Sequence, residues 1–235
     1  MATTSLTEYL VGGTLPVIDG AKLARALNDA ADEATTGGSG DADYLTFSGK
    51  TGAYALGRSR VDVDPGQLFL VETQTFEAGW ICWKNSKPVG RHKWSVMQPE
   101  LAIPEDELED HGPYRENSGD GWSPSLTVGL LSIDNKPSQV IFSTSSTSGR
   151  NVVGDLMREV GSRAEQNEPH ALPILTFDKV EFVAQGQKNW KPVLAVETWV
   201  TRPAATAYLD NRLSEEELLA GTAPKASRAK KRGKK

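Results

Sequence analysis

The chain contains 235 residues, of which 38% are hydrophobic and 24% charged, and its formal net charge is −5. It has a single cysteine, which excludes an internal disulfide and a zinc knuckle, and no apolar run of the ~18 residues that span a bilayer. The first residues lead into no apolar signal sequence, so we expect a cytoplasmic protein without a membrane partner.

The charge is segregated along the chain. Residues 222–235 contain seven Lys or Arg and no acid, and removing these seven from the net −5 leaves −12 for the rest. Residues 50–94 hold seven basic and four acidic residues, whereas acids gather at 105–110 and 215–217. Local charge matters more to binding than the total, so the negative sum does not exclude a nucleic-acid partner.

Composition divides the chain into three regions. Residues 1–40 are expected to form a short amphipathic helix and a flexible Gly-rich linker. Residues 41–202 hold the strands of the folded core, and residues 203–235 read as an acidic stub and a basic disordered tail. The middle region is long enough to bury a hydrophobic core.

The core is dominated by period-two patterns, which indicate β-strands, with one helical pattern. An acidic loop over 98–121 is expected to be mobile. In chain order we expect strands 44–47 and 53–56 as a hairpin, a long strand 68–83 bulged near Gly79, its partner 89–96, strands 126–131 and 140–142, a helix that starts within 145–148 and runs to 164, and strands 174–184 and 193–200.

This order of elements predicts a mainly β protein. Several antiparallel strands, one helix and a closing hairpin fit an OB-fold-like five-stranded Greek-key barrel with extra strands and flexible termini, the helix lying between strands three and four. Period counting does not separate this fold from another small barrel or a sandwich, so those alternatives stay open.

The segment Gly79–Trp94 carries the strongest functional signal. It holds three of the six tryptophans and four basic residues, with no acid. Rings that stack on bases and cations that follow phosphates are the features by which a surface holds a single nucleic-acid strand. Alternation along a strand sends Trp80 and Trp83 to opposite faces, so one of them lies outward or under the loop. Core filling is the alternative for each ring.

Basic residues elsewhere extend this prediction. Lys50 projects from the first hairpin turn, Arg150 lies near a helix start, and Trp190 stands between lysines at the tip of the last hairpin. Solvated surface charge, or capping near the helix, is the plain alternative for these cations. The predicted nucleic-acid-binding residues are Lys50, Arg58, Arg60, Trp80, Trp83, Lys84, Lys87, Arg91, Lys93, Trp94, Arg150, Lys188, Trp190 and Lys191.

Catalytic signals are weak. The three histidines have no ligand-spaced partner, and no Gly-x-Ser-x-Gly element occurs. The stretch Ser48–Thr51 lacks the upstream glycine of a phosphate-binding loop, because position 44 is Tyr. A nuclease would need a carboxylate cluster for its metal, and none stands out. We therefore expect no enzyme activity, no metal site and no cofactor.

Five stretches together resemble a family of tailed-bacteriophage early proteins, over roughly residues 43–200. They are Tyr44–Gly52, Gly79–Lys84, Phe142–Ser146, Gly149–Leu156 and Trp190–Val193. The resemblance implies an OB-fold single-stranded DNA-binding protein that acts in phage replication or recombination in the host cytoplasm. Its partners would be single-stranded DNA and phage replication or recombination proteins. The matched positions most worth testing are Lys50, Trp80, Trp83, Arg150 and Trp190.

The chain departs from that family's pattern at its end. Such proteins usually close on an acidic tail with a terminal hydrophobic residue, whereas this chain closes on Lys234–Lys235 and carries its acids upstream. Extra DNA contact by the tail is therefore expected in place of partner recruitment. The alternative function is a phage interaction or assembly factor whose β-barrel core presents its aromatic residues to another protein.

Overall fold

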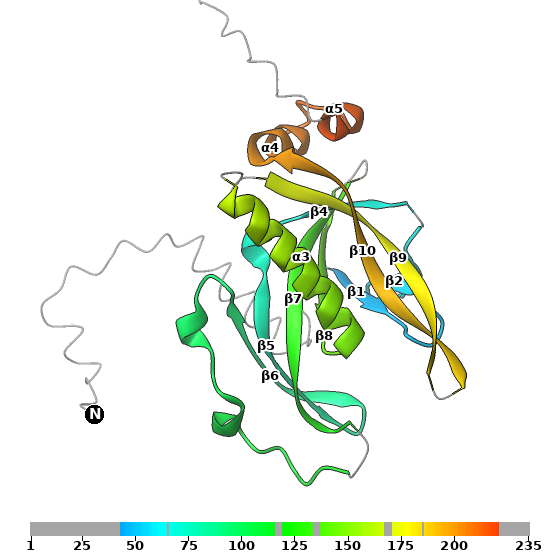
Figure 1. Ribbon diagram of the computed structural model, residues 1–235, viewed down its shortest axis with the longest axis vertical. Helices are drawn as coiled ribbons and strands as arrows, with labels where there is room; N and C mark the ends of the chain where they lie inside the picture. Colours follow the sequence, from blue (N-terminus) through cyan, green and yellow to red (C-terminus); the bar gives the residue numbers. More distant parts are fainter. Residues whose placement is uncertain are drawn as a thin grey trace, which may run out of the picture. The chain divides into compact units, whose positions relative to one another are not determined.

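The computed structural model describes residues 43–64, 66–115, 119–133, 137–166, 171–184 and 186–220. This part of the chain is mainly β, with a curled open sheet, or half-barrel, and few helices (Figure 1). The β-rich class expected from the period-two pattern is confirmed. The helix and linker expected within 1–40, and the basic tail from 221 onward, lie outside the described residues.

Among the described residues, strands precede and follow one long helix. None of the described helices has both the length and the apolar composition to cross a membrane. The described strands and helices are β1 (Asp43–Phe47), β2 (Tyr54–Leu56), β3 (Val61–Asp62), β4 (Leu68–Val71), β5 (Glu77–Lys84), β6 (Lys87–Ser95), β7 (Gly121–Ile133), β8 (Gln139–Thr144), α3 (Thr147–Glu165), β9 (Ala171–Ala184), β10 (Gln187–Thr201), α4 (Arg202–Leu209) and α5 (Glu215–Leu219), with short 3-10 turns at Thr73–Thr75, Pro99–Leu101 and Glu105–Glu107.

The strands pair in the order β10-β9-β4-β7-β8-β1-β2-β3, and β5 joins β7 and carries β6 on its other edge. The described pairs are antiparallel except β1 with β8, which run parallel. The first hairpin is confirmed as β1 and β2, with Leu45 opposite Leu56. The curl of the sheet brings the turn of this hairpin to β10, where the Trp190 amide donates to the Gly49 carbonyl at 2.7 Å.

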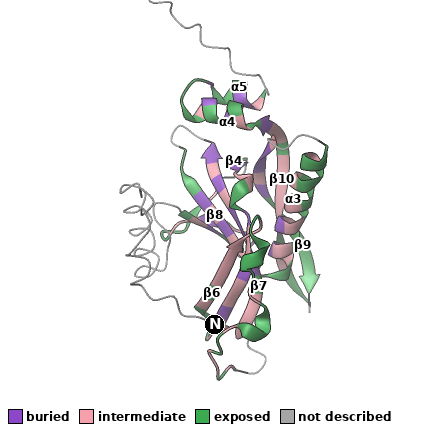
Figure 2. Cartoon of the chain, turned by 90° about the vertical axis from the view of Figure 1, so that its left-hand side faces the viewer, coloured by how far each residue is buried: buried purple, intermediate pink, exposed green. Residues whose placement is uncertain are grey.

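Helix α3 covers one face of the sheet. Its Val153 and Leu156 join Phe69 and Phe142 in the main hydrophobic core, because apolar residues at helical spacing form one buried stripe. Ser146 caps the helix by accepting a hydrogen bond from a main-chain amide at 3.1 Å, so the helix start expected from the Ser-rich approach is confirmed. Figure 2 shows buried residues in the middle strands and exposed residues at the far end of β9.

The helices α4 and α5 belong to a second hydrophobic cluster, although the sequence prediction ended the core at residue 202. Leu218 of α5 is 0% exposed and packs in one cluster with Ile174 and Val200. The sequence signal is weak because α5 has five residues, three of them acidic, and only one leucine is fully buried. The folded region therefore extends past the expected boundary to residue 219.

The long strand expected over 68–83 is wrong. The chain instead forms β4 and β5, separated by the turn Thr73–Thr75. The Glu72 carboxylate accepts from the Gln74 amide at 3.1 Å, and the Thr75 hydroxyl donates to the Glu72 carbonyl at 2.6 Å. Such local side-chain bonds offer backbone groups an alternative to the ladder, and they end the strand here.

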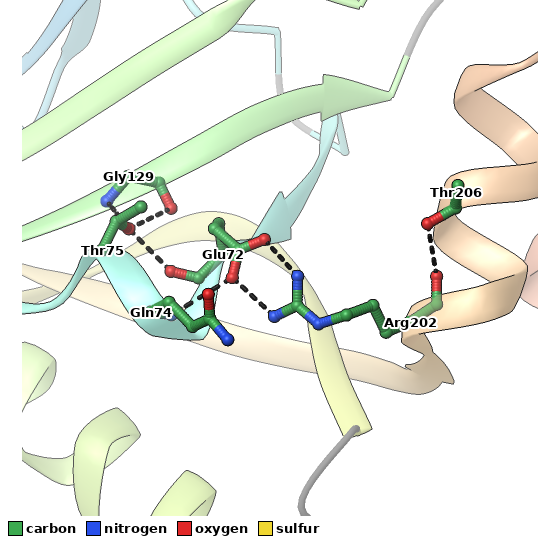
Figure 3. Close-up of polar contacts among 6 residues, drawn as sticks. All are labelled: Glu72, Gln74, Thr75, Gly129, Arg202 and Thr206. Carbon is green, nitrogen blue, oxygen red and sulfur yellow. Dashed lines mark hydrogen bonds and ion pairs between the residues drawn. The ribbon is translucent and has the colours of Figure 1, made fainter. Parts of the chain in front are cut away.

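The same Glu72 side chain binds Arg202 at the start of α4 (Figure 3). Both carboxylate oxygens accept from the guanidinium, at 2.7 and 2.8 Å, in a two-bond pair. Arg202 holds the pKa of the Glu72 carboxyl below its ordinary value, and Glu72 raises the pKa of the Arg202 guanidinium. The pair ties the β4–β5 turn to the C-terminal helices while the carboxyl is ionised.

Replacing Glu72 with Gln should lower the free energy of unfolding at neutral pH by about 1 kcal/mol, a modest figure because solvent screens this part-exposed pair. The folded-state pKa of Glu72 is lowered, so its stabilisation is present above the unfolded carboxyl pKa and is lost as pH falls through the folded value. Urea unfolding at decreasing pH should show the wild-type advantage shrinking. Asp155→Asn, which breaks the exposed Asp155–Arg158 pair on α3, is the control and should cost under about 0.5 kcal/mol.

Replacing Leu218 with Ala should destabilise the protein by about 2–5 kcal/mol, because it leaves a cavity in the second cluster. Leu209→Ala at the end of α4 is the matched control, since Leu209 is 45% exposed and its loss should cost under about 1 kcal/mol. Urea unfolding measures both. Equal small costs would place α5 outside the cooperatively folded unit.

Candidate nucleic-acid interface

The β5–β6 hairpin carries the aromatic and basic residues that the sequence singled out. β5 pairs with β7 in unbroken register from Glu77 to Trp83, so its side chains alternate between two faces. Trp80 and Trp83 therefore lie on opposite faces, as predicted. The bulge expected near Gly79 is wrong, because the register shifts between Cys82 and Trp83. Gly79 instead permits close approach of β6, whose carbonyl oxygen would lie 2.3 Å from an added Cβ.

Residues 97–115, which we call the covering loop, run beside β5 and β6 (Figure 1) and contact the Trp80 face of the hairpin. The Trp80 indole donates to the Ile103 carbonyl at 2.9 Å, and the Trp122 indole of β7 donates to the Glu109 carbonyl at 2.9 Å. The acidic loop that the sequence predicted to be mobile is thus fastened to the sheet by side-chain donors.

Two more predicted residues share this covered face. The Lys84 ammonium donates to the carbonyls of His111 at 2.7 Å and Gly112 at 3.2 Å. Trp94 lies beside His92, with ring centroids 5.7 Å apart. Lys84 thus holds the covering loop, and a phosphate would reach its ammonium only if the loop moved.

The opposite face of the hairpin presents Trp83 together with Arg91 and Lys93. By register, Ile81 lies opposite Arg91, and these side chains share the face of Trp83. Arg91 is exposed, and Lys93 pairs with Glu77 at 3.3 Å. The structure therefore brings one predicted tryptophan and two predicted cations to one side of the sheet.

Trp190 lies inside β10 and not at the tip of the last hairpin, where the sequence prediction placed it. β10 begins at Gln187, and Trp190 stands opposite Glu181 of β9. The expected start at residue 193 was too late. Residues 187–191 are exposed except for the half-buried Asn189 and Trp190, and Trp190 is their only large apolar side chain, so no apolar alternation can be detected.

The Trp190 ring rests against the β1–β2 turn. A Cβ on Gly52 would lie 2.7 Å from the Trp190 Cγ, and Gly52 has φ +69°, so glycine suits this position on both counts. The Trp190 amide is bonded to Gly49, and the Lys179 ammonium lies 5.0 Å from the ring centroid. Lys50, in the same turn, is thereby brought close to Trp190.

We call Lys50, Lys179, Lys188, Trp190 and Lys191 the Trp190 cluster. All four lysines are exposed, and Lys188 pairs with Glu181 at 3.1 Å. A ring that is held by a backbone bond, with one lysine beside it and three more exposed lysines in the adjoining turn and strand, has the chemical features needed to stack on a base while phosphates are neutralised.

A cleft of about 330 Å³ adjoins this cluster, with Tyr54, Phe177 and Lys179 in its walls. The Tyr54 hydroxyl donates to the Asp178 carbonyl at 2.7 Å, and burial raises the pKa of Tyr54 well above its ordinary value. The cleft also includes Asp62, Asp64 and Asp178. Carboxylates repel phosphate, so an uncharged base suits this cleft better than a phosphate group does.

The remaining predicted cations lie at other places. Arg58 and Arg60 are exposed in the turn between β2 and β3, and Lys87 is exposed at the start of β6. Arg150 lies in the first turn of α3, where its Nε donates to the Ser145 carbonyl at 3.2 Å. That bond fits the capping alternative for Arg150.

The sequence analysis missed Lys179, Tyr54 and Gly52, although all three adjoin Trp190 or its cleft. Lys179 and Trp190 lie on one side of the β9–β10 ribbon by register. The only sequence signal was alternation along the last hairpin, which could have paired Lys179 with that side. The contact between Gly52 and Trp190 joins distant segments and has no local signature.

Comparison with protein-family models, curated proteins and solved structures found no match for this chain. Within the described ranges, no three His, Cys, Asp or Glu side chains gather closely enough to hold a metal ion. Interpretation of the site therefore depends on its own geometry.

Replacing Gly52 with Ala should destabilise the protein by more than about 1 kcal/mol and displace the Trp190 ring, because the methyl group adds a clash to an unfavourable φ. Gly186→Ala is the matched control. Gly186 has φ +73° but nothing within 4 Å of an added Cβ, so it reports backbone strain alone. Urea unfolding and the Trp190 indole NMR resonance should separate them. Equal effects would contradict the packing of Trp190 on Gly52.

Proposed function

We propose that this protein binds single-stranded DNA without sequence preference and without catalysis, protecting exposed strands in phage replication or recombination. The observation that carries the proposal is the Trp190 cluster, in which a tryptophan seated on Gly52 has the Lys179 ammonium 5.0 Å from its ring centroid and three more exposed lysines in the adjoining turn and strand. The phage setting comes from the sequence resemblance alone.

Fixation of the ring favours binding. The backbone bond to Gly49 and the contact with Gly52 hold Trp190 before any ligand arrives, so little further ordering is needed when a base stacks. Lys50 and Lys191 are exposed on the two elements that meet at this ring. Such cations add affinity by releasing counterions from the strand, so binding should weaken steeply with salt.

We also propose that the core is related to the OB-fold. In support, the pairing path β10-β9-β4-β7-β8 follows the neighbour order of strands five, four, one, two and three of such a barrel. Helix α3 follows the third of these strands and precedes the fourth. The β1–β2 hairpin would then fill the gap between strands three and five.

On this interpretation the residues of the β5–β6 hairpin and those of the Trp190 cluster each belong to a connection that binds oligonucleotides in OB-folds. OB-folds grip oligonucleotides with the connections between strands one and two and between strands four and five. The β6 strand and covering loop fall in the first connection, and the β9–β10 ribbon forms the second. The second surface in contact with the DNA would then be formed by Trp83, Arg91 and Lys93.

A protein partner is the second candidate, favoured by apolar residues at the end of β9. Val180, Phe182 and Val183 are 46%, 41% and 69% exposed. Exposed apolar residues beside aromatic and basic ones are typical of interaction surfaces. A stoichiometric complex with another protein, in a preparation that does not bind oligonucleotide, would favour this function.

Trp190→Ala should weaken binding of oligo-dT by about tenfold, because stacking contributes about 1–3 kcal/mol per base. Trp199→Ala is the control, because Trp199 lies nine positions further along β10, where its ring contacts Arg163 of α3 at 4.1 Å and not the Trp190 cluster. Fluorescence anisotropy with labelled oligo-dT measures affinity, and circular dichroism checks folding. A wild-type protein that fails to bind oligo-dT at low salt would overturn the proposed function.

The lysines should act through charge. Lys50→Gln with Lys191→Gln should reduce the slope of log affinity against log salt by about 0.7 for each lysine removed. Arg158→Gln, at an exposed position of α3, removes a cation outside the Trp190 cluster and should leave that slope unchanged. An unchanged slope in the double variant would contradict a role for these lysines.

A further inference from the structure

We propose that the face beneath the covering loop is a second site for single-stranded DNA, and that the covering loop closes it by acting as an internal competitor. The inference rests on the proposed function and adds a regulated site to it. Its ligand would be the same strand that the Trp190 cluster holds.

The covered face carries three tryptophans. By register, Trp80, Trp94 and Trp122 lie on the same side of β5, β6 and β7. Lys84 and Lys87 stand opposite each other on that side, at the hairpin end. Three stacking surfaces followed by two cations are the composition that a single-stranded nucleic-acid site requires.

The covering loop uses the donors that a nucleic acid would use. Trp80 and Trp122 donate their indole N–H groups to loop carbonyls, and Lys84 donates its ammonium to two more. The loop also carries six acidic residues between positions 100 and 110. Carbonyl oxygens that accept from rings and a lysine, on a segment rich in acidic residues, resemble a phosphate backbone in acceptor chemistry and in charge.

The covering loop is held mainly by polar contacts. No residue from 97 to 115 is fully buried, and its half-buried large apolar or aromatic side chains are Ile103, Leu108, His111 and Tyr114. Segments with few buried apolar contacts open at much lower free energy than the whole fold. The covering loop can therefore leave the face while the sheet remains folded.

Gly90 offers a way to open the loop without changing its charge. A Cβ at Gly90 would lie 2.6 Å from His111 Nε2 and 2.9 Å from Trp122 Cη2. Gly90→Ala should therefore push His111 and the adjoining loop away from β6, and shift the edge of the Trp122 ring with them. Gly161→Ala on α3, where an added Cβ meets nothing within 4 Å, is the matched control.

Charge offers an independent way. Glu105→Gln with Asp106→Asn removes two exposed carboxylates from the covering loop, and Glu215→Gln with Glu216→Gln removes two from exposed α5 positions. Gly90→Ala and the loop charge variant should each bind oligo-dT about three- to tenfold more tightly, because opening increases the competent fraction. The two controls should match wild type in the same anisotropy assay.

Hydrogen exchange and NMR identify the site. Saturating oligo-dT should speed amide exchange in 98–112 and shift the Trp80 and Trp122 indole resonances. Trp122→Ala should abolish the extra affinity of Gly90→Ala, while circular dichroism confirms that the double variant remains folded.

The outcomes separate the two proposals. Oligo-dT binding that is lost in Trp190→Ala, with unchanged loop exchange and no gain in Gly90→Ala, would overturn the second site and leave the proposed function standing. Tighter binding by the opened variants with no effect of Trp190→Ala would support the second site and remove the Trp190 cluster from the proposed function. If wild type and opened variants all fail to bind, both proposals fall.

Discussion

The buried Tyr54 hydroxyl is the contact on which the curl of the sheet depends. It donates to the Asp178 carbonyl and accepts from the Val193 amide, so it joins the first hairpin to β9 and β10 where no ladder does. Its ring packs against Phe47 and Phe177, with centroids 4.7 and 4.9 Å away, so apolar contacts position the polar group. Burial raises the pKa of this hydroxyl, so it also stays protonated in alkaline solution. Because these bonds hold the first hairpin against β9 and β10, the neighbouring β1–β2 turn lies where the Trp190 ring can pack on it.

Sequence patterns predicted what local periodicity controls. The first hairpin, the long helix with its serine cap, and the opposite orientations of Trp80 and Trp83 all follow from period and spacing. The break after β4 was missed because Glu72 bonds the turn through its side chain, which leaves the apolar run unchanged in sequence. The place of Trp190 was missed for a different reason, since the seat is made by a turn far away along the chain.

The two faces of the β5–β6 hairpin have different surroundings. On one face the Trp80 indole and the Lys84 ammonium donate to the covering loop. On the other face Arg91 is exposed beside Trp83. A sequence shows which residues a strand carries, but the bonding partners of a donor depend on what folds over it. The sequence therefore predicted which residues gather on this hairpin. It could not predict which of their donors are already bonded to the covering loop.

The closure of the sheet also bears on how the chain reaches its fold. Tyr54 meets Val193 across 139 positions, and β1 pairs in parallel with β8, which follows most of the other strands. Contacts of such sequence separation must overcome loop-closure entropy before they stabilise anything, so they form late and slow folding. During synthesis the free edge of β1 would stay unpaired until β8 has left the ribosome, and the Tyr54 hydroxyl would lack its partner in β10 until the last strand follows. Nascent chains of this protein would then be most exposed to aggregation and to chaperones just before their last strand emerges.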